Sequence, residues 1–147
     1  MTSFNVGFVL FPNLTQLDLT GPLQVLSRLP DALVHVPAKT LDAAPSDCGL
    51  SLVPTTTFRD CAQLDLLCVP GGGFGVADAI ADGDTVAFIK KQAGGARYVT
   101  SACTGAFLLG ATGLLQGRRA TTHWAYRTCF PWLARHLGMP ASSKTTT

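Results

Sequence analysis

Short apolar runs alternate along the chain with longer stretches in which apolar residues recur at helical spacing. The runs lie at residues 6–11, 33–36, 64–69 and 98–101, with a weaker one at 50–53. A short, nearly continuous apolar run is typical of a strand that is buried on both faces, as in a parallel sheet. We therefore predict a strand at each of these runs.

The stretches between the runs predict helices. Leucines recur at helical spacing over residues 17–29, with Pro22 placed to occupy a first turn. Asp84 is expected to cap a helix over 85–93, and a further short helix is expected over 106–111. Strands and helices that alternate on this scale indicate an α/β fold, in which helices cover a mostly parallel sheet.

Composition narrows the class of protein. The chain has 147 residues, of which 47% are hydrophobic and 14% are charged, and this suits a single domain with its own core. A formal net charge of +2 gives no basis for nucleic-acid binding. Apolar stretches end well before the roughly 20 residues that span a bilayer, and the N-terminus lacks a signal-peptide pattern. We expect no membrane association.

The five cysteines indicate a reduced protein. They stand at 48, 61, 68, 103 and 129, without C-x-x-C spacing, so the pattern indicates neither a disulfide framework nor a zinc site. Cys68 lies inside a predicted strand and is expected in the core. Because free thiols persist in reducing compartments, we expect a cytoplasmic protein.

Cys103 is the strongest candidate for chemistry. It follows a predicted strand and precedes a predicted helix, with small Ala102 before it and Gly105 two places after it. This is the pattern of a nucleophile elbow in cysteine form, in which the helix N-terminus is expected to lower the thiol pKa. The alternative is a buried structural cysteine.

Other polar groups fall at the same ends of predicted strands, where ligands of parallel sheets bind. Asp18 is either a helix N-cap or a proton shuttle, and the glycines at 71–73 either offer backbone N–H groups or make a turn. Thr104 either contacts substrate or caps a helix, and His123 is either structural or a base that orients the cysteine.

Four ordered segments resemble the DJ-1/PfpI (ThiJ) superfamily. They are Asp-Leu-Thr-Gly-Pro at 18–22, Pro-Gly-Gly at 70–72, Ser-Ala-Cys-Thr-Gly-Ala at 101–106, and the run from Gly113 to Trp124. Within the superfamily the chain is most similar to the isocyanide hydratases, whose signature pairs a Gln-Leu-Asp-Leu-Thr-Gly-Pro segment with Cys-Thr at the elbow.

The resemblance implies a flavodoxin-like three-layer sandwich, a homodimer, and neither a metal nor an organic cofactor. It implies that Cys103 attacks an isocyanide as the small-molecule substrate, and that Asp18 protonates the adduct. Hydrolysis of the resulting cysteine thioimidate would release an N-substituted formamide. Thr104, Gly72 and Gly73 would position substrate and water.

Two departures from the pattern bear on function. The protease-like members carry His after the cysteine, where this chain has Thr104, which argues against peptidase activity. Residues 1–126 are expected to form the DJ-1/PfpI-like domain, whereas 127–147 form an atypical tail that does not match the family. The loss of pattern indicates a truncation or a shifted reading frame, with a sheet left incomplete at its C-terminal end.

Three alternatives to the hydratase stay open. The first is a non-catalytic ligand-sensing domain related to AraC-type regulators, and the second is an inactive truncated remnant. The third is a glyoxalase-like or deglycase-like activity, whose known examples generally carry Glu rather than Asp at the position of Asp18.

Overall fold

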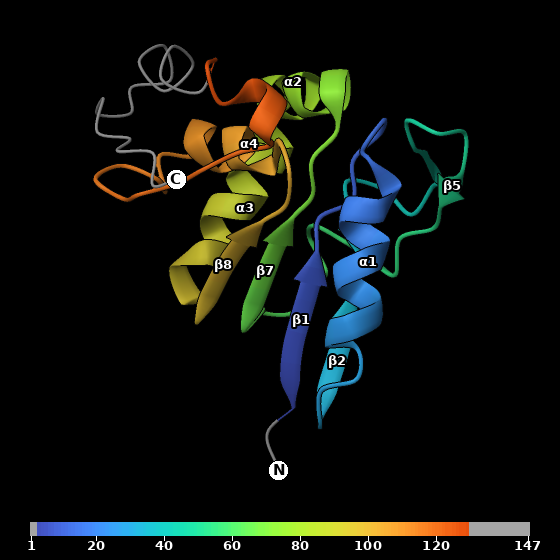
Figure 1. Ribbon diagram of the computed structural model, residues 1–147. Helices are drawn as coiled ribbons and strands as arrows, with labels where there is room; N and C mark the ends of the chain where they lie inside the picture. Colours follow the sequence, from blue (N-terminus) through green and yellow to red (C-terminus); the bar gives the residue numbers. More distant parts are fainter. Residues whose placement is uncertain (1–2, 130–147) are drawn as a thin grey trace.

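A parallel sheet forms the centre of the computed structural model, which describes residues 3–129. Within this range four strands pair in the order β2-β1-β7-β8, and every pair is parallel (Figure 1). The strands are β1 (Phe4–Phe8), β2 (Ala32–His35), β7 (Leu66–Val69) and β8 (Tyr98–Ser101). The four strong strand predictions and the α/β fold class are confirmed.

Helices cover both faces of this sheet. Helix α1 (Gln16–Leu26) lies over β1 and β2, whereas α3 (Gly83–Gly95) and α4 (Gly105–Ala111) pack on the opposite face against β7 (Figure 1). From β1 the chain first crosses to β2 on one side and later to β7 and β8 on the other. Because such crossovers are right-handed, helices on the two sides lie on opposite faces of the sheet. Helix α2 (Gly73–Ala81) and the short 3₁₀ helix η1 (Trp124–Tyr126) lie above the carboxyl ends of the strands (Figure 1).

The segment between β2 and β7 forms two small two-stranded pairs. One joins β3 (Pro37–Ala38) to β6 (Thr56–Thr57), and the other joins β4 (Ala44–Pro45) to β5 (Ser51–Leu52). The weak run at 50–53 thus forms a strand, but only over two residues.

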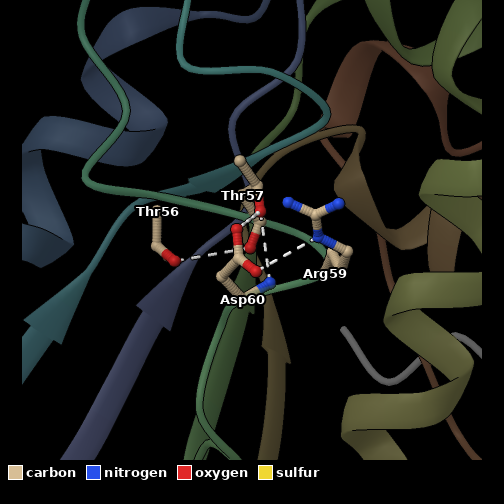
Figure 2. A network of polar contacts seen from close by, with 4 residues as sticks. All are labelled: Thr56, Thr57, Arg59 and Asp60. Atoms are coloured by element: carbon tan, nitrogen blue, oxygen red, sulfur yellow. Dashed lines mark hydrogen bonds and ion pairs between the residues drawn. The ribbon is translucent and has the colours of Figure 1, made fainter.

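A polar turn closes this segment before β7 begins, as Figure 2 shows. The Thr57 hydroxyl donates to the Asp60 carboxylate over 2.6 Å and accepts the Asp60 N–H over 3.1 Å. Arg59 Nε lies 3.2 Å from the other carboxylate oxygen. The Thr57 hydroxyl and Arg59 both hold the pKa of the Asp60 carboxyl below its usual range.

The core forms where β1 and β7 meet the helices. Val6 and Phe8 of β1, Leu67 and Val69 of β7, and Leu108 of α4 are completely buried. By contrast, all four residues of β8 are exposed, and no other strand of the described chain pairs with its outer edge. The sheet therefore has a rigid centre and an open edge.

Helix α2 was not predicted from the sequence. It begins Gly73-Phe74-Gly75, and glycine disfavours a helix in the absence of tertiary contacts. Here a Cβ at Gly75 would lie 2.5 Å from the Asn13 carbonyl oxygen, so close packing against the loop before α1 requires the glycine.

Two predicted helix starts were wrong. Helix α1 begins at Gln16, so Pro22 lies in its interior rather than in its first turn. There it gives up the hydrogen bond that an N–H would donate to the Asp18 carbonyl. Helix α3 is capped by Asp82 rather than Asp84, and the Asp82 carboxylate accepts a hydrogen bond from Thr85 Oγ1 over 2.7 Å.

No helix within residues 3–129 is long and apolar enough to cross a membrane. Most of the predicted tail at 127–147, namely residues 130–147, lies outside the described residues.

Candidate active site

The carboxyl ends of β1, β7 and β8 converge, as the strand pattern predicted. Thr15, just before α1, donates its N–H to the Gly71 carbonyl over 2.9 Å. Ala102, just after β8, donates its N–H to the Val69 carbonyl over 3.0 Å. The segment after β7 is thereby tied on one side to the start of α1 and on the other to the Cys103 turn.

Cys103 occupies the sharp turn that the sequence predicted. Its φ is +50°, a left-handed conformation that is costly for any residue except glycine. Gly105 lets α4 start directly behind it, because a Cβ at 105 would collide with the Val69 carbonyl oxygen. Thr122 Oγ1 donates a hydrogen bond of 3.1 Å to the Cys103 carbonyl. These neighbours hold the strained turn in place.

Asp18 reaches the cysteine from the first turn of α1. Thr15 is the N-cap of this helix, so the helix-cap interpretation of Asp18 is wrong. Instead Asp18 Oδ2 accepts the Gly71 N–H over 3.2 Å, and the carboxylate lies close enough to the Cys103 thiol to raise its pKa. The structure therefore brings the predicted acid and the predicted nucleophile together.

Thr104 completes a small polar cluster around the sulfur. Its Oγ1 accepts the Gly72 N–H over 3.0 Å, and its hydroxyl and backbone N–H lie close enough to Cys103 to lower the pKa of the thiol. It is also the N-cap residue of α4. The Gly72 N–H is thus engaged by Thr104, whereas Gly73 opens α2, where first-turn N–H groups have no intrahelical acceptor.

The thiol pKa of Cys103 shifts in the direction opposite to the prediction. Burial raises the pKa most, and the Asp18 carboxylate raises it further, whereas the backbone N–H and hydroxyl of Thr104 lower it. The prediction of a lowered pKa was wrong because the sequence did not show how far the thiol is buried against a carboxylate. Burial and the neighbouring Asp18 carboxylate therefore favour the protonated thiol of Cys103 over the thiolate.

An apolar cavity of about 330 Å³ lies beside this cluster. Helix α2 forms one wall, while α4 and the η1 region form the others, and Thr104 contributes the polar group that adjoins Cys103. The residues that line it are Gly73, Phe74, Val76, Ala77, Ile80, Thr104, Phe107, Tyr126 and Cys129. A small, largely apolar molecule fits this space, which reaches the Cys103 turn at Thr104.

His123 has a structural role in the described part of the chain. Its Nδ1 accepts the Ala125 N–H over 3.2 Å and so caps η1, and no hydrogen bond joins it to Cys103 within residues 3–129. Sequence reasoning missed the role of Thr122 and did not identify Asp18 as the acceptor of the Gly71 N–H. Thr122 and Gly71 both lie inside segments singled out above, but neither pattern shows which atom each residue approaches.

The remaining cysteines form no second site. All five cysteines are free; Cys48 and Cys129 are exposed, and burial raises the pKa of the Cys68 thiol. Among residues 3–129 no group of three or more His, Cys, Asp or Glu side chains is placed to hold a metal ion.

Comparison with known families settles the ancestry of the chain. The DJ-1/PfpI family profile matches residues 5–134. The chain belongs to the DJ-1/PfpI family. Its parallel sheet with helices on both faces is the flavodoxin-like fold of this family.

Individual relatives agree with this assignment. The chain is 56% identical to the isonitrile hydratase of Pseudomonas putida over 131 residues, which cover 89% of this chain and 57% of the relative. A crystal structure of a ThiJ/PfpI family protein from Pseudomonas syringae aligns with a TM-score of 0.87 at 37% identity, over 97% of this chain and 57% of that one. The chain thus spans just over half the length of both relatives.

A regulator is also similar. The HTH-type transcriptional regulator GbdR of Pseudomonas aeruginosa is 29% identical over 141 residues, which cover 88% of this chain and 38% of the regulator.

Proposed function

We propose that the protein hydrates isocyanides, converting an isocyanide and water to an N-substituted formamide. Cys103 serves as the nucleophile, and Asp18 serves as both acid and base. The observation that carries the proposal is the position of the Asp18 carboxylate beside Cys103 on a strained turn: Asp18 Oδ2 and Cys103 Cβ each lie 2.8 Å from where a Cβ at Gly71 would stand. The 56% identity to an isonitrile hydratase supports this reaction class.

The first step joins the thiol to the substrate. The Cys103 sulfur bonds to the terminal carbon of R–N≡C, and the thiol proton passes through Asp18 to the same carbon. The product is a thioimidate, R–N=CH–S–Cys103, formed without oxidant or reductant. The raised thiol pKa keeps the proton in the site until Asp18 accepts it. The hydroxyl and N–H of Thr104 stabilise the negative charge that develops on sulfur.

The second step releases the product. Water adds to the thioimidate carbon while Asp18 takes one of its protons and passes it to the nitrogen. The remaining hydroxyl proton then passes through Asp18 to the sulfur as the C–S bond breaks, so that the thiol is restored and R–NH–CHO departs. Thr104, held by the Gly72 N–H, and the N–H of Gly73 at the start of α2 position the substrate and the water. No step uses a metal or an organic cofactor.

The surroundings of the site suit such a substrate. An isocyanide presents one reactive carbon on a hydrocarbon body, and the cavity beside Thr104 is lined mainly by apolar side chains.

We place the protein in the cytoplasm as a homodimer, because its five cysteines are free and the family resemblance implies a dimer. Size-exclusion chromatography and a cooperative thermal melt test the dimer and the integrity of the fold.

The deciding experiment measures formamide production from an alkyl isocyanide. Cys103→Ala is expected to lower kcat/KM at least about 1,000-fold, because the reaction loses its nucleophile. Cys48→Ala removes an exposed cysteine outside the site and is expected to stay within about twofold of the unchanged protein. A Cys103→Ala protein with full turnover would falsify the assignment. Methylglyoxal, supplied in parallel, tests the glyoxalase-like alternative.

A ligand-sensing domain is the second candidate, favoured by the similarity to a transcriptional regulator. In that case the apolar cavity binds a small molecule without converting it. Binding in solution would then survive Cys103→Ala, and no formamide would accumulate with either protein.

A further inference from the structure

Two consecutive backbone N–H groups hold the two side chains that shift the pKa of the Cys103 thiol. The Gly71 N–H donates to Asp18 Oδ2 over 3.2 Å, and the Gly72 N–H donates to Thr104 Oγ1 over 3.0 Å. Both glycines are buried, and they follow β7, whose last three residues are buried as well. The partners of the thiol are thereby fixed to the most rigid part of the sheet.

Gly71 lies at the point where three residues of the site meet. A Cβ at this position would stand 2.7 Å from the Thr104 backbone nitrogen, 2.8 Å from Asp18 Oδ2 and 2.8 Å from Cys103 Cβ. All three distances are shorter than real Cβ contacts, so any side chain at 71 must displace at least one of these groups. The Gly71 carbonyl also accepts the Thr15 N–H over 2.9 Å, which fixes the peptide relative to the start of α1.

We propose that Gly71 is a positioning residue, whose bare α-carbon and N–H together hold the Asp18 carboxylate against the Cys103 thiol. This role rests on the proposed function for the identity of the nucleophile and goes beyond it, because the Gly71 N–H and carbonyl are engaged by Asp18 and Thr15 and Gly71 acts through Asp18. The Asp18 side chain is the flexible member of the three groups. A methyl group at 71 therefore displaces the carboxylate first.

Displacement of Asp18 is expected to make the Cys103 thiol easier to ionise and, at the same time, to slow turnover. Asp18 disfavours the Cys103 thiolate through its charge and its hydrogen bond, so its removal makes the thiol easier to ionise. The same removal separates the acid and base from the reacting carbon. Among the described residues, Asp18 is the charged group that acts on Cys103; it also raises the pKa of Cys68 on β7, which burial raises more.

The test compares thiol reactivity with turnover in the full chain carrying Gly71→Ala. Iodoacetamide alkylation of the Cys103 peptide is followed by mass spectrometry across pH, since only the thiolate reacts. The alkylation midpoint is expected to fall, with up to about tenfold faster labelling at pH 7. Formamide turnover is expected to fall at least about tenfold, with kcat changed more than KM. In an Asp18→Asn background, Gly71→Ala is expected to alter labelling less than about twofold.

Gly7→Ala is the matched control. Gly7 lies in β1, is buried like Gly71, and would collide with the Leu64 side chain rather than with the site. It is expected to lower stability without moving the alkylation midpoint. An unshifted midpoint in folded Gly71→Ala, or an equal shift in Gly7→Ala, overturns the proposal.

A second measurement applies if Gly71→Ala folds poorly. The melting temperatures of Asp18→Ala, Gly71→Ala and the double variant then form a cycle. The proposal expects the methyl group at 71 to cost less once the carboxylate is gone, and strictly additive losses contradict it. Alkylation requires no isocyanide, so it tests the role of Gly71 independently of turnover. If the midpoint shifts but the unchanged protein has no hydratase turnover, the role of Gly71 in placing Asp18 beside Cys103 stands and the proposed function is rejected.

Discussion

Strands β7 and β8 lie side by side and run parallel, and each leads into a turn that carries part of the candidate site, yet they differ completely in burial. Leu67 of β7 is 0% exposed, whereas its register partner on β8, Val99, is 36% exposed. The buried strand leads to the glycine turn that donates backbone N–H groups, and the exposed strand leads to Cys103, the proposed nucleophile.

Because β8 is exposed, its own packing cannot fix the position of Cys103. That position depends on contacts with neighbours: the Ala102 N–H on the Val69 carbonyl, the Thr122 hydroxyl on the Cys103 carbonyl, and Gly105 packed against the end of β7. The buried strand β7 therefore fixes the position of the site, and the exposed strand β8 carries the candidate residue Cys103. Local stability should fall from β7 toward β8.

The largest effect should come from truncating the paired residues Leu67 and Val99. Leu67→Ala is expected to lower the free energy of unfolding by about 2–5 kcal/mol, because it empties a completely buried position. Val99→Ala is expected to cost about 1 kcal/mol or less, because it lies on an exposed edge strand. Urea denaturation measures both. Equal losses would mean that β8 is as firmly packed as β7.

Gly105→Ala tests how α4 is held against β7. The added Cβ would meet the Val69 and Pro70 carbonyl oxygens, which belong to the backbone and cannot rotate away. We expect a loss of about 1–3 kcal/mol in unfolding free energy and a matching loss of hydratase turnover. Gly94→Ala in α3, where nothing lies within 4 Å of the new Cβ, serves as control and should be neutral or slightly stabilising. Similar losses at both positions would argue against the collision.

The sequence was sufficient for the parts of the site that depend on strand order. Apolar runs located the four strands, and the carboxyl ends of parallel strands meet at one edge, which brought Asp18 and Cys103 together. The small residues around Cys103 were enough to predict its sharp turn, and its φ of +50° agrees.

What the sequence did not show depends on contacts between distant segments. Helix α2 begins with glycines that only the approach of the Asn13 carbonyl explains. The direction of the Cys103 pKa shift depends on burial against Asp18, 85 positions earlier in the chain, and not on the neighbouring helix alone. The acceptors of the Gly71 N–H and of the Thr122 hydroxyl could not be predicted for the same reason, since hydrogen-bond partners are set by tertiary packing.

Thr122→Val tests the hydrogen bond that supports the strained turn from outside the sheet. Loss of the 3.1 Å contact with the Cys103 carbonyl is expected to cost about 1 kcal/mol of stability and to lower turnover several-fold. Thr121→Val is the control, because its exposed hydroxyl contacts only the neighbouring Thr122 carbonyl. Thermal melting and formamide production follow both variants. If Thr121→Val is as damaging as Thr122→Val, the contact with Cys103 is not what holds the turn.

The smallest predicted effect reverses the usual order of two substitutions. Glycine normally destabilises relative to alanine because the unfolded chain gains freedom, by about 0.4–1 kcal/mol. At Cys103 the φ of +50° costs alanine about 1–2 kcal/mol that glycine does not lose. Cys103→Gly should therefore be more stable than Cys103→Ala by up to about 1 kcal/mol, although neither supports turnover.

Cys68 provides the internal reference for this reversal. It lies buried within β7 in an extended strand, where glycine has no conformational advantage, so Cys68→Gly should be less stable than Cys68→Ala. Thermal melting of the four variants measures both differences. If Cys103→Gly is less stable than Cys103→Ala, as expected for the pair at 68, the left-handed turn is not strained in solution. Opposite signs at 68 and 103 would show that the strain lies in the turn that carries the thiol and not in the buried strand beside it.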